Sequence, residues 1–290
     1  MKPISNIFAL MLCCLVLTWP VGTLAFSFDL GDLKKLTDDI RKIRGKVSTE
    51  EEIQMGGNLI SGLLGAAPLV DDPELQRYIN DVGFWVASQS ARKDLPWRFG
   101  VIDSDGINAF AAPGGYILIT LGLLDLLENE AQLAGVLAHE ISHVVMKHHL
   151  KALQKTMKRD FWANLGARLV VDDEEDRKRL EKLVNLGVQL YATGLDRSLE
   201  YDADVKGVVL AARSGYDPYA LLDVLTTLDS INPEADALTV MLKTHPPIAD
   251  RLIELATTMD GKLDQYASGQ TNQTRFLEVA GNINPSPIKP

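Results

Sequence analysis

Most of this chain follows the pattern of amphipathic helices, in which apolar residues recur every three or four positions. Ser48 and Glu51 form a capping box at the start of the first clear helical segment. Asp72 and Pro73 open a second helix, because proline is well tolerated in the first turn. The pattern predicts a mainly helical protein whose core is built from the apolar faces of these helices.

The pattern changes between Trp97 and Thr120, where three short segments favour β-strands over helices. These segments cover residues 98–102, 107–112 and 116–120, with turn residues at 105–106 and 113–115. Helical patterning resumes afterwards and continues nearly to the end of the chain. We therefore expect an α+β fold, mainly α-helical, with a small three- to four-stranded sheet.

Downstream of the sheet, a helix is predicted to begin at Asn129, a good N-cap residue with Gln132 three positions later. Further helices are expected from about residue 183 to 214, from Asp217 onward, and from the prolines at 246–247 to Met259. The polar stretch 172–182 reads as a connection between helices. From Gln270 the sequence shows no packing pattern, so residues 270–290 are predicted to be a disordered tail.

The N-terminus resembles a secretory signal peptide. Lys2 precedes an apolar run at residues 7–17, and small residues end at Ala25, so the expected signal peptide is 1–25 and the folded domain 26–269. An uncleaved membrane anchor is the alternative. Both cysteines, Cys13 and Cys14, lie in this segment, so the mature chain has neither a disulfide nor a thiol ligand. These features predict a soluble protein of the bacterial periplasm with no transmembrane span.

The formal net charge of −10 and the pI near 5.0 argue against a nucleic-acid partner. Binding to phosphate backbones depends on clustered lysine and arginine, which release counterions from the nucleic acid. The acidity is most simply explained by solubility.

The candidate chemistry begins with His139, Glu140 and His143, which form an H-E-x-x-H motif inside the helix that starts at Asn129. Two histidines four positions apart share one helix face and can bind the same zinc ion. Glu140 follows the first histidine and can reach a water at the metal as general base. This predicts a site for one Zn²⁺ per chain.

A catalytic zinc usually has three protein ligands, and two candidates exist for the third. His149 has the spacing of an extended motif in which the helix ends at a glycine. Here Met146 occupies that position, and Met146 and Lys147 are good helix formers, so the helix is expected to continue and point His149 away. His148 and His149 are then exposed or lie behind the ligands.

Glu200 is the better candidate, because it shares a helix face with Asp204 four residues later. The carboxylate of Glu200 could complete the metal site, while Asp204 could orient a ligating imidazole. Alone, this pair is more typical of a solvated acidic patch. Beside the H-E-x-x-H motif, and in a helix with small Ala203 and Gly207, it favours the metal site.

At these residues the chain resembles the gluzincin family of HtpX, BepA and the CAAX prenyl endopeptidase. The matching pieces are Asn108-Ala109-Phe110-Ala111-x-Pro113-Gly114-Gly115, Gly122-Leu123-Leu124, the H-E-x-x-H motif, Glu200-x-x-Ala203-Asp204, and Thr244-His245-Pro246-Pro247 with Arg251. The resemblance spans roughly residues 50 to 260. It implies zinc bound by His139, His143 and Glu200, with Glu140 catalytic. We expect neither the membrane spans nor the helical-repeat extension found in some relatives, and Ser142 replaces a common glycine.

His245 and Arg251 are candidates for donors that stabilise an oxyanion, since the resemblance places their segment near the zinc. The alternatives are a helix-capping histidine and an arginine in a surface salt bridge. His245 could also occupy the open zinc position and keep an enzyme inactive.

Residues Asn108, Ala109, Phe110 and Ala111 are predicted to form an edge strand beside the metal helix. Such an edge could hold a substrate as an added strand, with little dependence on its sequence. An ordinary hairpin is the alternative.

These predictions favour a periplasmic zinc metalloendopeptidase that cleaves unfolded or misassembled envelope proteins in quality control. Association with a membrane or an assembly machinery stays open. The alternative is a chaperone-like, zinc-containing protein that binds clients with little turnover. Glu140 favours the enzyme, because a binding module does not need a carboxylate beside the water position. A purely structural zinc site fits poorly, because such sites favour four closed ligands.

Overall fold

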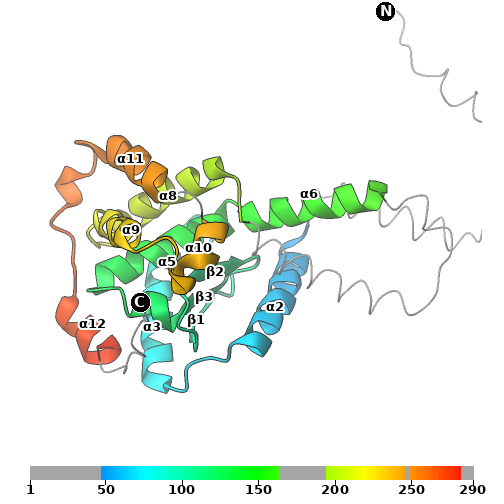
Figure 1. Cartoon of the computed structure of the whole chain (residues 1–290), viewed down its shortest axis with the longest axis horizontal. Coiled ribbons are helices and arrows are strands. Elements are labelled where there is room, and N and C mark those ends of the chain that lie inside the picture. Colours follow the sequence, from blue (N-terminus) through cyan, green and yellow to red (C-terminus); the bar gives the residue numbers. More distant parts are fainter. Residues whose placement is uncertain (1–46, 164–193, 246–247, 282–290) are drawn as a thin grey trace, which may run out of the picture. The chain divides into compact units, whose positions relative to one another are not determined.

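The structure is a computed structural model that describes residues 47–163, 194–245 and 248–281 (Figure 1). The predicted signal peptide and the polar stretch 172–182 lie outside the described residues.

The sheet contains three strands in the described part of the chain, in the order β1-β3-β2. Strand β1 (Arg98–Ile102) runs parallel to β3 (Tyr116–Thr120), and β2 (Ala109–Ala112) runs antiparallel to β3. The turn between β2 and β3 uses Gly114 and Gly115, whose φ angles of 83° and 101° favour glycine. The prediction of a small sheet in a mainly helical protein is confirmed, although β2 begins two residues later than expected.

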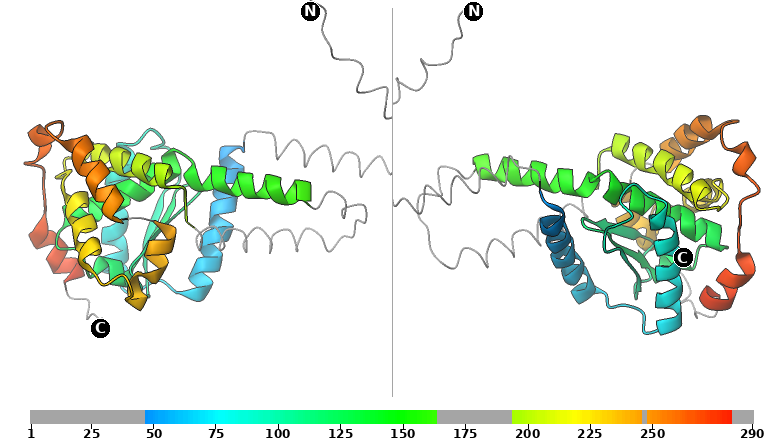
Figure 2. Two further views of the ribbon diagram at one scale, coloured as in Figure 1. Left: turned by 45° about the horizontal axis from the view of Figure 1, so that its top comes forward. Right: turned by 180° about the vertical axis from the view of Figure 1, so that it is seen from behind.

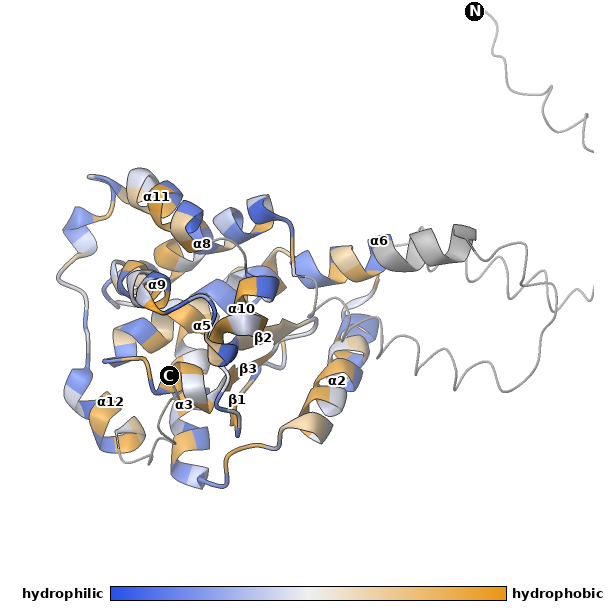
Figure 3. Cartoon of the chain, viewed as in Figure 1, coloured by the Kyte–Doolittle hydropathy of each residue, from blue (hydrophilic) through white to orange (hydrophobic). Residues whose placement is uncertain are grey.

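Alternate residues of the strands contact different helices, as the two-residue repeat of a strand requires. Ile117 and Ile119 join the main core with α3 (Pro73–Ser88) and α5 (Glu130–Val145). Phe110 and Leu118 belong to a second core cluster, formed with α2 (Thr49–Ala66). Figure 3 shows the strands in hydrophobic colours, whereas the surrounding helices alternate between hydrophobic and hydrophilic residues. Both faces of the sheet are therefore buried, and α5 is fixed against one of them.

Helix α5 lies at the centre and packs against α8 (Arg197–Arg213) and α9 (Ala220–Ser230), while α11 (Ile248–Met259) covers α8 and α9 (Figures 1 and 2). Two glycines permit this close packing. A Cβ atom at Gly207 of α8 would lie 3.0 Å from the backbone nitrogen of His139, and one at Gly135 of α5 would lie 3.2 Å from Leu221. The backbones of α5 and α8 thus approach closely at the H-E-x-x-H motif.

Further elements complete the described fold. They are α4 (Leu121–Leu124), α6 (His148–Ala163), the 3₁₀ turns η2 (Asp236–Leu238) and η3 (Asp264–Tyr266), α10 (Thr239–Thr244) and α12 (Gln273–Ala280). The capping signals at Ser48, Asp72 and Asn129 are confirmed, since each side chain accepts hydrogen bonds from the first turn of its helix. None of the helices that the structure describes is long and apolar enough to cross a lipid bilayer.

The prediction of one helix from about residue 183 to 214 is wrong. Residues 194–196 are not helical, and α8 begins only at Arg197. Gly194 has a φ angle of 74°, and a Cβ atom there would lie 2.3 Å from the backbone oxygen of Lys243. This close contact with the segment before His245 interrupts the helical pattern.

The predicted disorder from Gln270 is also wrong for residues 270–281, because α12 packs onto the body. Phe276 is buried, and Arg275 donates hydrogen bonds to Glu130 at the start of α5. One aromatic residue and one long-range ion pair give no periodic signal in the sequence.

The helix that carries the motif ends at Val145, contrary to the prediction that it continues to His149. Lys147 has a φ angle of 60°, in the left-handed region, and α6 starts at His148. The buried carboxylate of Glu52 accepts hydrogen bonds from Lys147 (2.7 Å) and Arg92 (2.6 Å), and Arg92 also donates to the backbone oxygen of Val144 (3.1 Å). These contacts stabilise a break that the residue types at this position do not indicate.

Candidate metal centre

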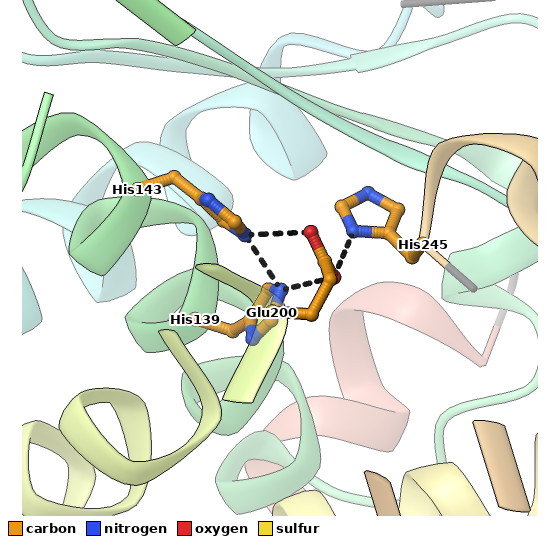
Figure 4. Close-up of side chains that lie close together, drawn as sticks. All are labelled: His139, His143, Glu200 and His245. Carbon is orange, nitrogen blue, oxygen red and sulfur yellow. Dashed lines mark hydrogen bonds and ion pairs between the residues drawn. The ribbon is translucent and has the colours of Figure 1, made fainter. Parts of the chain in front are cut away.

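The two histidines of the motif lie on one face of α5 and point at the same place (Figure 4). Their Nε2 atoms are 3.0 Å apart. Glu200 projects from α8 and puts its carboxylate oxygens 3.6 Å from Nε2 of His139 and 3.5 Å from Nε2 of His143. The side chains of two helices thus converge, as the family resemblance implies.

His245, at the end of α10, completes this group. Its Nδ1 lies 2.7 Å from Oε2 of Glu200, and one ligand atom from each of the four side chains lies within 4.8 Å of all the others. All four residues are buried. The structure therefore brings His245 to the ligands, although it comes from a distant part of the sequence.

The donor set and the spacing fit a zinc ion. Bonds of about 2.0–2.2 Å to imidazole nitrogen and carboxylate oxygen, in tetrahedral geometry, require ligand atoms about 3.3–3.5 Å apart. The separations of 3.0, 3.5 and 3.6 Å among His139, His143 and Glu200 are close to this range. Oε1 of Glu200 is buried without a hydrogen-bond partner, as expected for an atom that binds a metal.

Asp204 and Arg251 hold the first of these histidines from behind. Nδ1 of His139 lies 2.8 Å from Oδ1 of Asp204, and Arg251 donates two hydrogen bonds to the same carboxylate, at 2.8 and 2.6 Å. Burial lowers the pKa of His139, but the charge and the hydrogen bond of Asp204, together with the hydrogen bond of Glu200, outweigh it and raise the pKa to about 9. Asp204 thus occupies the position expected for a residue that orients a ligating imidazole.

Arg251 is fully buried rather than part of a surface salt bridge. Two of its nitrogens bind Asp204, and the third, Nη1, lies 3.7 Å from Oε2 of Glu200 and has no hydrogen-bond partner. The guanidinium therefore pairs with the carboxylate of Asp204 and lies near that of Glu200, and its Nη1 donates no hydrogen bond.

Glu140 lies beside the ligand group without joining it. Its Oε2 is buried and has no hydrogen-bond partner, and its Oε1 is 3.9 Å from Nε2 of His245. Burial raises the pKa of Glu140, which is the direction that suits a general base near neutral pH.

A small apolar pocket adjoins Glu140 and His245. Its walls include Leu221, Val224, Leu225 and Leu228 of α9 together with Met241 of α10. A side chain in this pocket would contact aliphatic groups, with the polar residues of the site at one end.

The residues predicted to bind substrate take different places. Ala109 lines the pocket, and Ala111 faces the main core, whereas Phe110 points to the opposite face of the sheet. Asn108 lies just before β2, and its Oδ1 accepts a hydrogen bond of 3.3 Å from Thr244, the neighbour of His245. Strand β2 is at one end of the described sheet, as predicted, and its use for substrate stays a prediction.

Of the two alternatives for His148 and His149, exposed or behind the ligands, the first is wrong, because both are buried. The sequence did not indicate which ligand either of them contacts. Nδ1 of His148 lies 2.9 Å from Nδ1 of His143. The chain break at Lys147 produces this contact, and no residue type at 146–147 signals it.

Residues 72–259 match Peptidase family M48. The chain is 30% identical over 249 residues to the beta-barrel assembly-enhancing protease of Yersinia pestis, a match that covers 84% of this chain and 51% of that protein. It is 28% identical over 209 residues to the mitochondrial metalloendopeptidase OMA1 of Arabidopsis thaliana (71% and 41% covered). The chain spans about half the length of these curated relatives.

A third match is to a Protease HtpX homolog of Dictyoglomus thermophilum, 29% identical over 192 residues, covering 53% of this chain and 61% of that protein.

Proposed function

The chain belongs to peptidase family M48, and we propose that it is a zinc-dependent metalloendopeptidase that cleaves unfolded or misassembled proteins of the cell envelope. One observation carries the proposal. His139, His143 and Glu200 converge on one point, and the carboxylate of Glu140 lies beside that point with an oxygen that makes no hydrogen bond.

In this proposal, His139, His143 and Glu200 hold the zinc, and Glu140 moves the proton. Bound zinc supplies Lewis acidity to the scissile carbonyl and makes a neighbouring water more acidic. Glu140 accepts the proton of the attacking water and later delivers it to the leaving amine. Its buried position excludes bulk water, so that the proton stays with the reacting groups.

Asp204 and Arg251 support this chemistry by holding His139. The bidentate contact of Arg251 with Asp204 fixes the carboxylate, and the carboxylate fixes the imidazole. The remaining nitrogen of Arg251, Nη1, could donate a hydrogen bond to an oxyanion after a small movement. The contacts of Arg251 therefore support both of its proposed roles, holding Asp204 and stabilising the oxyanion.

His245 acts as a gate in this proposal. It lies among the ligand atoms, where the substrate carbonyl would have to enter. It therefore has to move aside before hydrolysis, after which its imidazole can donate a hydrogen bond to the oxyanion.

The substrate class follows from the surroundings. The pocket formed by α9 and Met241 suits an aliphatic side chain next to the scissile bond, and Ala109 of strand β2 lines the same pocket. Extended segments with exposed aliphatic residues are typical of unfolded proteins. The similarity to beta-barrel assembly-enhancing proteases and the predicted signal peptide support action in the bacterial periplasm.

The test compares the zinc-loaded protein with its Glu140→Gln variant on an unfolded model protein. We expect Glu140→Gln to keep its zinc and its fold and to lose about 10²–10⁴-fold in cleavage rate, because the general base is gone. Fragment release is followed by mass spectrometry, and zinc content is measured in the same samples.

Equal cleavage by both proteins would contradict the role of Glu140. Zinc binding and client binding without cleavage by either protein would support the alternative of a chaperone-like protein.

A further inference from the structure

The two histidines of the metal centre differ in what holds their outer nitrogen. Nδ1 of His139 faces the carboxylate of Asp204, whose charge Arg251 balances. Nδ1 of His143 faces another imidazole nitrogen, Nδ1 of His148, at 2.9 Å. Histidines that bind a metal through Nε2 normally donate the proton on Nδ1 to an acceptor that fixes the ring.

The fold places His148 there through a specific chain reversal. The left-handed conformation of Lys147 ends α5 and starts α6 at His148, which turns the imidazole back toward the preceding turn. Lys147 is held by the buried carboxylate of Glu52, which also accepts hydrogen bonds from Arg92. A continuous helix would carry residue 148 to a different face from residue 143, because five residues correspond to about 500° of rotation.

The pair is buried and its geometry is well defined. His143 and His148 are 0% and 2% exposed, and their ring planes cross at 74° with centroids 5.0 Å apart. The two facing Nδ1 atoms can form one hydrogen bond only if one carries the proton and the other accepts it. When His143 binds the metal through Nε2, its Nδ1 carries the proton, so His148 must be the acceptor.

We propose that His148 is a positioning residue for the zinc site, which accepts the Nδ1 proton of His143 and thereby fixes the orientation and tautomer of that ligand. This inference rests on the proposed function, because it assumes that His143 binds zinc. In this proposal both zinc-binding imidazoles are neutral. Nδ1 of His139 faces the charged carboxylate of Asp204, and Nδ1 of His143 faces the uncharged imidazole of His148.

The test is the zinc affinity of the purified protein, measured by competition with a chelator, so that it needs no peptidase activity. In His148→Phe the ring is similar in size but cannot accept a hydrogen bond. In His148→Asn the side-chain oxygen sits at the same distance along the chain as Nδ1 and can accept one. We expect His148→Phe to bind zinc about 10–100-fold more weakly and His148→Asn to stay within a few-fold of the unmodified protein.

Two further measurements separate positioning from packing. The unfolding of the metal-free proteins in denaturant reports packing alone, and here phenylalanine should be tolerated at least as well as asparagine. The visible spectrum of the Co²⁺-loaded proteins reports the ligand geometry, and it should change in His148→Phe and recover in His148→Asn.

Equal zinc affinity in His148→Phe and the unmodified protein would overturn this proposal and leave the proposed function intact. So would a loss in His148→Asn as large as that in His148→Phe. If the unmodified protein bound no zinc, the proposed function itself would fail and this inference with it.

Discussion

Glu130 and Glu200 are both fully buried carboxylates in contact with α5, yet their surroundings differ. Glu130 starts the helix and accepts hydrogen bonds from four side chains of three other segments: Tyr78 (2.7 Å), Tyr216 (2.8 Å), Asn272 (2.9 Å) and Arg275 (2.6 Å). Glu200 accepts one, from His245, and its other oxygen has no hydrogen-bond partner.

This difference indicates that the carboxylate of Glu130 has a structural role, whereas that of Glu200 is placed to bind a cation. Burying a carboxylate is unfavourable unless its charge and lone pairs are compensated. Glu130 is compensated by the protein itself and joins α3, α5 and α12. Glu200 is surrounded by imidazole nitrogens at 3.5–3.6 Å, and a cation among them would complete its coordination.

The largest expected effect comes from Glu200→Gln. An amide oxygen is a much weaker zinc ligand than a carboxylate, so we expect zinc affinity to fall by more than about 100-fold, beyond the loss typical of an orienting residue. The metal-free variant should change by only about 1–2 kcal/mol in its free energy of unfolding, the value of the hydrogen bond to His245. Chelator competition and denaturant unfolding measure the two quantities. Retained zinc affinity would remove Glu200 from the ligand set.

Glu130→Gln should show the opposite behaviour. The new amide group faces donors that it cannot satisfy, so we expect a loss of about 2–3 kcal/mol in the free energy of unfolding. This expected loss of stability is smaller than the loss on breaking a fully buried ion pair, because the side chain of Arg275 is 58% exposed and can regain water. Zinc affinity of the folded variant should not change. A large drop in zinc affinity without loss of stability would contradict the comparison.

The smallest effect is the pH dependence of the Glu130 cluster. Burial raises the pKa of Glu130, but the hydrogen bonds from Arg275, Tyr78 and Tyr216 outweigh it and hold the pKa below the ordinary value of 4.5. A lowered folded pKa means that the stabilisation is complete above pH 4.5 and is lost as the pH falls toward the folded value. The stability difference between the unmodified protein and Glu130→Gln should therefore shrink below pH 4.5.

Denaturant unfolding of the metal-free proteins at several pH values measures this difference. A difference that stays constant from neutral pH down to pH 3 would show that the charge of Glu130 does not stabilise the fold.

The sequence was sufficient for the features that depend on local spacing. The H-E-x-x-H pair, the shared face of Glu200 and Asp204, and the caps at Ser48, Asp72 and Asn129 each need only a few neighbouring residues. The family resemblance added the convergence of these segments, and the placement of His245 and Arg251 beside them is seen in the structure.

Features that depend on distant partners could not be predicted in this way. The left-handed Lys147 is stabilised by Glu52, 95 residues away, so its own residue type predicted a continuing helix. That error left open whether His148 is exposed or lies behind a ligand, whereas the structure brings it into contact with His143. Likewise, α12 is fixed by Arg275 contacting Glu130, 145 residues away, which no periodic pattern reveals.

The central claim is that one zinc ion is held by His139, His143 and Glu200. The most direct measurement is anomalous diffraction at the zinc absorption edge from crystals of the zinc-loaded protein. We expect one peak per chain, with both Nε2 atoms about 2.0–2.1 Å away and a Glu200 oxygen at about 2.0–2.2 Å. No peak among these side chains, or zinc bound by other residues, would contradict the account.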